Sequence, residues 1–231
     1  MYFSFNKDHE TGKGLIKTPH GPIHTPSYVP VATNACIKAC TSEQINTLNI
    51  ELLFCNTYHL IVHPGPETVY RAGGLHQFMG RSQPIITDSG GFQIFSLMYG
   101  GVHDELKSKG TKKHNPSIIS VTEEGATFRN YRTGQKIFLS PEGSVQAQKM
   151  LGADIIIPLD ELLPFHAEQA SFERSFYRTH RWQIRSFLEH EKNFFLSLLF
   201  TSAFSKAFAC GITVWFSFIT LGDLNLGGFR S

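Results

Sequence analysis

The stretch PIITDSGGFQIF, residues 84–95, decides how the rest of the chain is interpreted. Its opening run, residues 84–87, is short and apolar, which predicts a buried strand, and Asp88 follows it directly. Two adjacent glycines and a second apolar run come next. A short apolar strand that ends in a polar residue is a pattern that recurs at two other places along the chain.

Residues 51–55 and residues 154–159 are the other predicted strands, and Asn56 and Asp160 follow them. Short strands that are apolar on both faces and alternate with helices are typical of a parallel α/β sheet. Ligand sites in such sheets and barrels form at the carboxyl ends of the strands. We therefore expect the three polar residues to converge at one edge. Residues 22–31 are expected to be extended, since three prolines interrupt them.

Capping residues predict the helices between these strands. A short helix is expected over residues 41–50, with Thr41 or Ser42 as the N-cap. A second helix is expected to begin at Ser140, which a proline and a glutamate follow, and to end just before Gly152.

Asp88 has two interpretations. It can cap the helix that follows or shape a turn, as aspartate often does. Alternatively, Ser89, Gly90 and Gly91 let the backbone approach a ligand closely, and Phe92 offers a flat face for stacking. An acid, a glycine floor and an aromatic ring together suit a planar heterocycle.

The pair Asp160-Glu161 is open to the same two interpretations. Paired acids at a strand end can act only as a helix cap. A carboxylate also accepts two N–H donors side by side, which is how an acid recognises a guanine-like edge. Two aspartates on separate strand ends can moreover hold different protonation states.

Metal sites are only weakly indicated. Cys36 and Cys40, and His59 and His63, have spacings that suit zinc if they are helical, but neither pair has a matching second pair nearby. Packing or hydrogen bonding is favoured for these side chains. With Cys210 and Cys55 the chain has four cysteines, which suggest no disulfide framework.

A basic stripe is predicted on one helical face, because four arginines follow at i, i+4, i+7 and i+11: Arg174, Arg178, Arg181 and Arg185. The stripe is either an ordinary solvated surface or a strip that contacts the phosphates of a nucleic acid such as tRNA.

Composition excludes several classes of protein. Of the 231 residues, 41% are hydrophobic and 13% aromatic, which supports a sizeable core and excludes wholesale disorder. The net charge of +2 excludes a histone-like polycation. The first residues contain charges and no apolar run, so no secretory signal is expected and a cytoplasmic location is predicted.

The composition changes near residue 193, which predicts a boundary between residues 1–193 and an apolar tail, residues 194–231. The tail contains 8 of the 20 phenylalanines and only three charges, Lys206, Asp223 and Arg230. It could be a membrane span, although Lys206 lies near its middle, where a charge is costly. It could also be a buried part of the domain, or a stretch never selected to fold with the body, such as the product of a shifted reading frame.

Residues 87–93, TDSGGFQ, resemble the signature of the tRNA-guanine transglycosylases (queuine tRNA-ribosyltransferases). Further matching motifs follow in family order up to about residue 192: HGPIHTPSYVPVAT (20–33), NTYHL (56–60), PGPE (64–67), GGLHQFM (73–79), TEEGATFR (122–129), LSPE (139–142), LGADI (151–155), LDE (159–161) and THRW (179–182).

The resemblance implies a (β/α)8 TIM barrel with a zinc-binding insertion, of which residues 1–193 would form the N-terminal half to two-thirds. It implies exchange of guanine at the tRNA wobble position for queuine or its precursor base, through a covalent RNA–enzyme intermediate. The implied partners are tRNA, a guanine- or queuine-type base and, in the full-length family, a second copy of the chain.

By motif match, Asp88 would be the general acid/base residue, and Asn56 would help to order the catalytic carboxylates. Asp160 would hydrogen-bond the base edge. Leu162 stands where the family often has cysteine or valine, which leaves the choice of incoming base open. The base pocket would be formed by Ser89, Gly90 and Gly91, with Phe92 stacking on the base.

The family continues after THRW with a Gly-rich pocket strand, a second aspartate that is the nucleophile, and a Cys-x-Cys-x-x-Cys…His zinc site; this sequence has none of them. Asp223 lacks the expected context. No zinc is therefore expected for this chain, and we predict a truncated member that is inactive alone. The alternatives are a non-catalytic module that binds a base or tRNA and, from the tail alone, a membrane-anchored protein.

Overall fold

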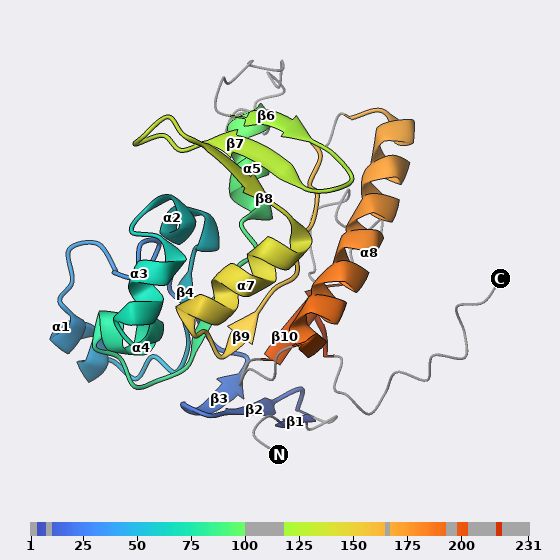
Figure 1. Cartoon of the computed structure of the whole chain (residues 1–231). Coiled ribbons are helices and arrows are strands. Elements are labelled where there is room, and N and C mark those ends of the chain that lie inside the picture. The colour runs from blue at the N-terminus through green and yellow to red at the C-terminus, as the bar shows by residue number, and fades with distance from the viewer. Residues whose placement is uncertain are drawn as a thin grey trace.

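The computed structural model describes residues 4–7, 11–99, 118–164, 167–192, 198–202 and 216–218 (Figure 1). Its central sheet has the spatial order β11 (Phe216–Phe218), β10 (Leu198–Ser202), β9 (Ile155–Ile156), β5 (Ile85–Thr87) and β4 (Leu53–Cys55). The strands from β10 to β4 run parallel, and β11 is antiparallel to β10. The predicted mixed α/β fold with a parallel sheet is confirmed.

β9 is shorter than the run 154–159 that was predicted as a strand. The reason is a side chain of helix α7 (Pro141–Leu151). Gln148 accepts a hydrogen bond from the Ile157 N–H at 2.9 Å and donates one to its carbonyl at 2.8 Å. An amide side chain thus replaces the neighbouring strand as the partner of this backbone. β9 therefore ends at Ile156, because Gln148 and not a neighbouring strand bonds to the backbone of Ile157.

The predicted starts of both helices and the end of α7 are confirmed, whereas α1 (Ser42–Thr47) ends at Thr47, before the predicted residue 50. α1 begins after Thr41, which forms a capping box with Gln44. Ser140 accepts from the Gly143 N–H at 3.0 Å at the start of α7. Gly152 ends α7 with a φ of 74°, a conformation that other residues adopt at a cost.

Five further helices complete the described fold. Four are the shorter ones that follow the strands: α2 (Thr57–Val62), α3 (Pro66–Arg71), α4 (Gly74–Met79) and α5 (Gly91–Tyr99). The long α8 (Gln169–Lys192) packs beside α7 along one side of the molecule (Figure 1). None of the helices in the described part of the chain is both long and apolar enough to cross a bilayer.

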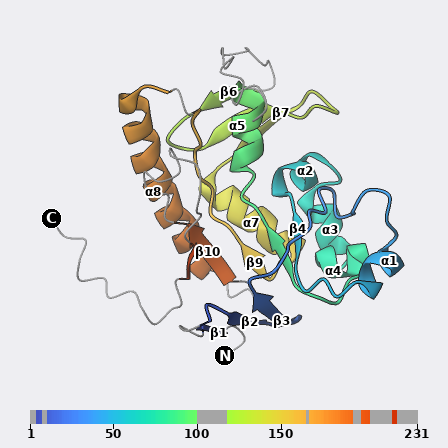
Figure 2. The same cartoon turned by 180° about the vertical axis from the view of Figure 1, so that it is seen from behind.

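Two antiparallel sheets lie at opposite ends of the parallel sheet (Figures 1 and 2). The first consists of β1 (Ser4–Lys7), β2 (Gly14–Thr18) and β3 (Gly21–Thr25). β3 coincides with the first part of the run 22–31 that was predicted to be extended. It packs through Ile16 and Ile23 on Leu52, just before β4. The second consists of β6 (Ile118–Val121), β7 (Ala126–Arg129) and β8 (Lys136–Leu139).

The second antiparallel sheet covers the carboxyl ends of the parallel strands. Its inward side chains join a buried cluster with the residues that follow β4, β5 and β9 and with α8: Tyr58, Val62, Ile94, Ala126, Phe128, Leu139, Leu159 and Trp182. Burial of these large apolar side chains is the main stabilising contribution at this end. The edge predicted to bear the site therefore lies beneath the packed apolar face of the β6–β7–β8 sheet.

Beyond the predicted boundary at residue 193, β10 continues the parallel sheet. Leu198 pairs with Ile155, and Leu199 pairs with Ile156. Most of the segment predicted as an apolar tail, 194–231, lies outside the described residues.

Candidate active site

Asn56 and Asp88 lie side by side because β4 and β5 are parallel neighbours in register, with Cys55 opposite Thr87. The Asn56 side-chain amide donates to Asp88 Oδ2 at 3.0 Å. The Thr57 N–H donates to Asp88 Oδ1 at 2.6 Å, and the Thr57 hydroxyl donates to the Asp88 carbonyl at 2.5 Å. The Asp88 carboxylate is therefore fixed by the first turn of α2.

The two interpretations of Asp88 can be compared with this geometry. Its carboxylate bonds to the first turn of the neighbouring helix α2, whereas the local turn is closed by Ser89, whose Oγ accepts from the Gly91 N–H at 3.2 Å. Burial raises the pKa of Asp88, and the hydrogen bonds from Thr57 and Asn56 oppose this rise. A buried carboxyl with a raised pKa is suited to taking up and returning a proton.

At Gly91 the turn passes very close to Asp160. A Cβ atom at this position would lie 2.6 Å from the Asp160 carbonyl oxygen and 2.7 Å from its Oδ1. Gly90 has a φ of 86°, so the turn needs both glycines. The Ser89 hydroxyl donates to Asp160 Oδ1 at 3.1 Å, and Ser144 donates to the Ser89 carbonyl at 2.8 Å. The predicted serine, glycines and second aspartate are thus brought together.

Asp160 is held in a more apolar setting than Asp88. The pKa of Asp160 is raised to about 6. Burial is the largest cause, the charge of Asp88 adds to the rise, and the hydrogen bond from Ser89 opposes it. Burial therefore raises the pKa of both carboxyls, Asp88 and Asp160.

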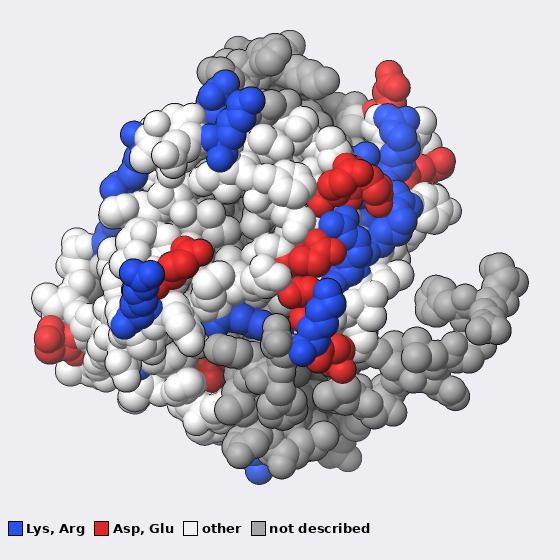
Figure 3. All heavy atoms as spheres, viewed as in Figure 1, with Lys and Arg blue, Asp and Glu red and all other residues white. Residues whose placement is uncertain are grey.

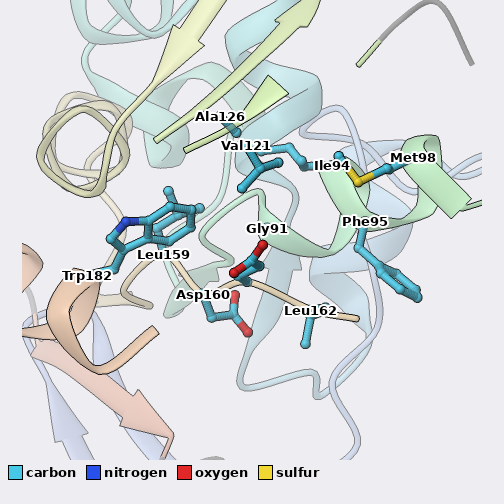
Figure 4. A pocket seen from close by; sticks show the side chains of 11 residues that line it. Gly91, Ile94, Phe95, Met98, Val121, Ala126, Leu159, Asp160, Leu162 and Trp182 are labelled. Carbon is cyan, nitrogen blue, oxygen red and sulfur yellow. The ribbon is translucent and has the colours of Figure 1, made fainter. Parts of the chain in front are cut away.

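A hollow lies beside these residues (Figure 4). Gly91, Asp160 and Leu162 line it together with an apolar wall from four elements: Ile94, Phe95, Met98, Val121, Ala126, Leu159 and Trp182. Phe92 is not among the lining residues. Its ring is 45% exposed and lies 6.3 Å from that of Phe95. Leu162, by contrast, is one of the residues that line the hollow.

Sequence reasoning missed Gln148, which ties the two aspartate-bearing strands together. Besides its two bonds to Ile157, its Oε1 accepts from the Thr87 hydroxyl at 3.0 Å. Thr87 directly precedes Asp88. A signal was present: Ser144 and Gln148 stand at i and i+4 on the buried face of α7, where apolar residues are expected.

Glu161, next to Asp160, is anchored to α8. Arg178 Nη1 lies 2.7 and 2.8 Å from its two carboxylate oxygens. The Glu161 N–H donates to Thr179 Oγ1 at 3.1 Å, and Ser175 donates to the Glu161 carbonyl at 3.0 Å. α8 thus positions the segment that carries the second aspartate.

Three of the four arginines of the predicted stripe face acids. Arg178 bonds Glu161, Arg181 bonds Glu123 at 2.6 Å, and Arg185 bonds Glu142 at 2.7 Å, so blue and red spheres alternate along α8 in Figure 3. Arg174 is exposed and donates to Ser171 at 2.8 Å. The ion pairs favour a structural role for this face, and a contact with tRNA stays a prediction.

The cysteines and histidines with zinc-like spacing do not form a ligand group. Cys36 and Cys40 are exposed before α1, and burial lowers the pKa of His59 in α2. In the described part of the chain, only His20, His76 and Asp154 bring three candidate ligand atoms together.

This histidine cluster does not fit a zinc ion. His20 Nδ1 lies 2.7 Å from Asp154 Oδ1, and His76 Nε2 lies 3.2 Å from Oδ2. The two rings stack 3.6 Å apart at an angle of 15°. A metal lies close to the plane of each imidazole that binds it, and stacked rings cannot both meet this condition. The geometry of this cluster therefore supports no zinc site at His20, His76 and Asp154.

A comparison with protein families agrees with the geometry. Residues 12–203 match the sequence model described as Queuine tRNA-ribosyltransferase. The chain belongs to the queuine tRNA-ribosyltransferase family. This confirms the resemblance that the motifs around Asp88 indicated.

Three relatives that bear the family name illustrate the match. The queuine tRNA-ribosyltransferase of Chlamydia pneumoniae is 58% identical over 198 residues, covering 84% of this chain and 52% of the relative. That of Chlamydia muridarum is 61% identical over 180 residues, or 78% of this chain and 47% of the relative. That of Protochlamydia amoebophila is 52% identical over 83% of this chain and 51% of the relative. The chain spans about half the length of these relatives.

Proposed function

We propose that this chain carries the base-recognition part of a tRNA-guanine transglycosylase, which exchanges guanine at the wobble position of tRNA for queuine or its precursor base. One observation carries the proposal. Asp88 directly follows β5, Asp160 lies four residues after the neighbouring strand β9, and Ser89 in the turn after Asp88 donates a 3.1 Å hydrogen bond to Asp160. Burial raises the pKa of both carboxyls, and Asp160 lines the hollow, which supports the proposal.

Each residue has a defined task in this proposal. Ionised Asp160 accepts the ring N–H and the exocyclic amine of guanine, two parallel donors that a carboxylate pairs with directly. Ser89 orients that carboxylate. Asp88, ordered by Asn56 and Thr57, exchanges a proton with the base as its bond to the ribose breaks or forms. Gly90 and Gly91 shape the turn that brings Ser89 against Asp160, and Phe92 stacks on the base.

The same proposal covers the wider architecture. Parallel strands with their polar residues at the carboxyl ends and helices between them suit the first part of a (β/α)8 barrel. The predicted boundary at residue 193 is moved in this proposal, because β10 pairs with β9 and the family match reaches residue 203. The nucleophilic aspartate and the zinc ligands that the family resemblance implies have no part in this proposal. Homodimerisation and a cytoplasmic location stay predictions.

The test uses the purified 231-residue chain. Guanine is titrated by calorimetry, with adenine as the control because its edge offers one donor beside an acceptor. The same preparation is assayed for incorporation of labelled guanine into tRNA. We expect guanine to bind, adenine not to bind, and no label to be incorporated. Failure of guanine to bind a folded chain contradicts the base site, and robust incorporation contradicts the inactivity of the chain alone.

A further inference from the structure

Three described cations without acidic partners lie close together on the β7–β8 hairpin. Arg129, Arg132 and Lys136 are exposed, and none of them forms an ion pair with an acid in the described part of the chain. Arg129 only donates to the Gly134 carbonyl, at 3.4 Å. In Figure 3, blue spheres without adjacent red ones lie over this hairpin, in contrast to α8. The hairpin therefore presents an attractive field to an anion.

The register of the hairpin makes this concentration of charge unusual. Arg129 lies directly opposite Lys136 on the outer face of the sheet, an arrangement that repels. The next pair on that face is Thr127 and Phe138, whose ring is 55% exposed. Tyr131 in the turn is 56% exposed. Two cations that repel each other beside exposed aromatic rings are typical of a surface that binds single-stranded nucleic acid.

The hairpin is fixed to the helix that orders the catalytic aspartate. Buried Asn130 donates to the Val62 carbonyl, at the end of α2, at 3.1 Å. Its Oδ1 accepts from the N–H groups of Arg132 at 2.8 Å and Thr133 at 3.2 Å, which closes the turn. The Phe128 ring lies 5.0 Å from that of Tyr58 in α2. α2 has six residues, about 9 Å of helix, and its first N–H bonds Asp88.

We propose that the β7–β8 hairpin, Ala126–Leu139, is an arm that contacts the RNA substrate. Arg129, Arg132 and Lys136 bind phosphates next to the nucleotide whose base enters the site, and Phe138 and Tyr131 provide ring faces for an unstacked neighbouring base. The inference rests on the proposed function and names the surface through which that site receives RNA. It moves the RNA contact from α8, whose arginines are paired with acids, to the hairpin.

The charges are tested by salt dependence. An RNA stem–loop with guanosine at the wobble position is titrated by fluorescence anisotropy at several KCl concentrations. The variant R129Q/R132Q/K136Q is compared with K17Q/K38Q/R71Q, which removes three exposed cations elsewhere. Each lost phosphate contact makes the slope of log K against log[salt] shallower by about 0.7, so we expect a change of about 2 for the hairpin variant and none for the control.

The outcomes separate the two proposals. If the wild-type chain binds no RNA at any salt concentration, RNA recognition by this chain fails, and the arm fails with it. If the wild type binds RNA and the hairpin variant shows an unchanged slope, the arm alone is wrong. Guanine binding by the hairpin variant, expected to equal that of the wild type, shows that its base site is intact.

The aromatic rings are tested separately. Phe138→Ala and Tyr131→Ala are expected to weaken RNA binding about tenfold each without changing the salt slope, because stacking releases no counterions. Equal affinity of both variants and the wild type would contradict the stacking role.

Discussion

At the residue scale, the proposed base site predicts that the protonation of Asp160 sets the pH range of guanine binding. Its pKa is raised to about 6, mainly by burial, and only the ionised form accepts both donors of guanine. We therefore expect guanine affinity to be nearly constant above pH 7 and to fall about tenfold per pH unit below 6. Calorimetric titration between pH 5 and 8 checks this. Asp160→Asn should bind guanine weakly at every pH, and a variant that retained the pH dependence would assign it to another group.

Gly91 is the position where a single added carbon is expected to disrupt the site. A Cβ atom there meets both the carbonyl and the carboxylate of Asp160 at less than 3.0 Å. Backbone atoms cannot move aside cheaply, so we expect Gly91→Ala to lower the free energy of unfolding by about 1–3 kcal/mol and to abolish guanine binding.

The matched control is Gly143→Ala in α7, where the nearest atom to a new Cβ is Ser140 Oγ at 3.5 Å. Alanine is expected to stabilise that helix by about 0.5–1 kcal/mol. Urea unfolding of both variants measures the difference. Similar stabilities would show that Asp160 can retreat from Gly91.

The sequence was sufficient to predict which strand ends converge but not what orders them. Asn56, Asp88 and Asp160 follow short apolar runs, and parallel pairing then places them on one edge. The partners Thr57 and Gln148 were missed because their roles depend on three-dimensional neighbours. Phe92 contacts the ring of Phe95 and is 45% exposed, and its stacking on a base stays a prediction.

At the scale of elements, capping residues located the helices, whereas the extent of β9 depended on one side chain of another element. Gln148 takes the place of a strand next to Ile157 and also binds Thr87. Its replacement therefore affects both aspartate-bearing strands at once.

We expect Gln148→Leu to lower the free energy of unfolding by at least about 2 kcal/mol, because it leaves buried polar groups of Ile157 and Thr87 without partners. Base binding should weaken as well, since both aspartates lose support. Gln146→Leu, on the exposed face of the same helix, is expected to cost less than about 1 kcal/mol. Chemical denaturation followed by circular dichroism distinguishes the two. Equal costs would mean that β9 does not depend on Gln148.

The arginines of α8 show why a helical pattern alone does not define a binding surface. The spacing correctly placed them on α8, but their partners Glu123, Glu142 and Glu161 come from three other segments. The sequence could not show that these acids would meet them. The cations of the hairpin share no single spacing in the sequence, because Arg129 and Lys136 lie on two different strands and Arg132 lies in the turn between them.

At the scale of the whole molecule, His20, His76 and Asp154 join the N-terminal sheet, α4 and the start of β9. Asp154 is buried, and it also accepts from the Ile85 N–H at 2.9 Å. Burial alone would raise its pKa, but the hydrogen bonds from His76, His20 and Ile85 outweigh this and lower it below the ordinary value. The cluster therefore stabilises the fold only while Asp154 is ionised.

The sign of the pH dependence follows from this shift. A carboxyl with a folded pKa below its unfolded value of about 3.9 contributes its full stability above that value and loses it as the pH falls through the folded pKa. We expect the free energy of unfolding, measured in urea, to fall steeply below about pH 4. Asp154→Asn should be less stable at pH 7 and lose less on acidification. If the free energy of unfolding of Asp154→Asn fell below pH 4 as steeply as that of the wild type, another carboxyl would have to be responsible. The N-terminal sheet, α4 and β9 would then be joined by packing alone.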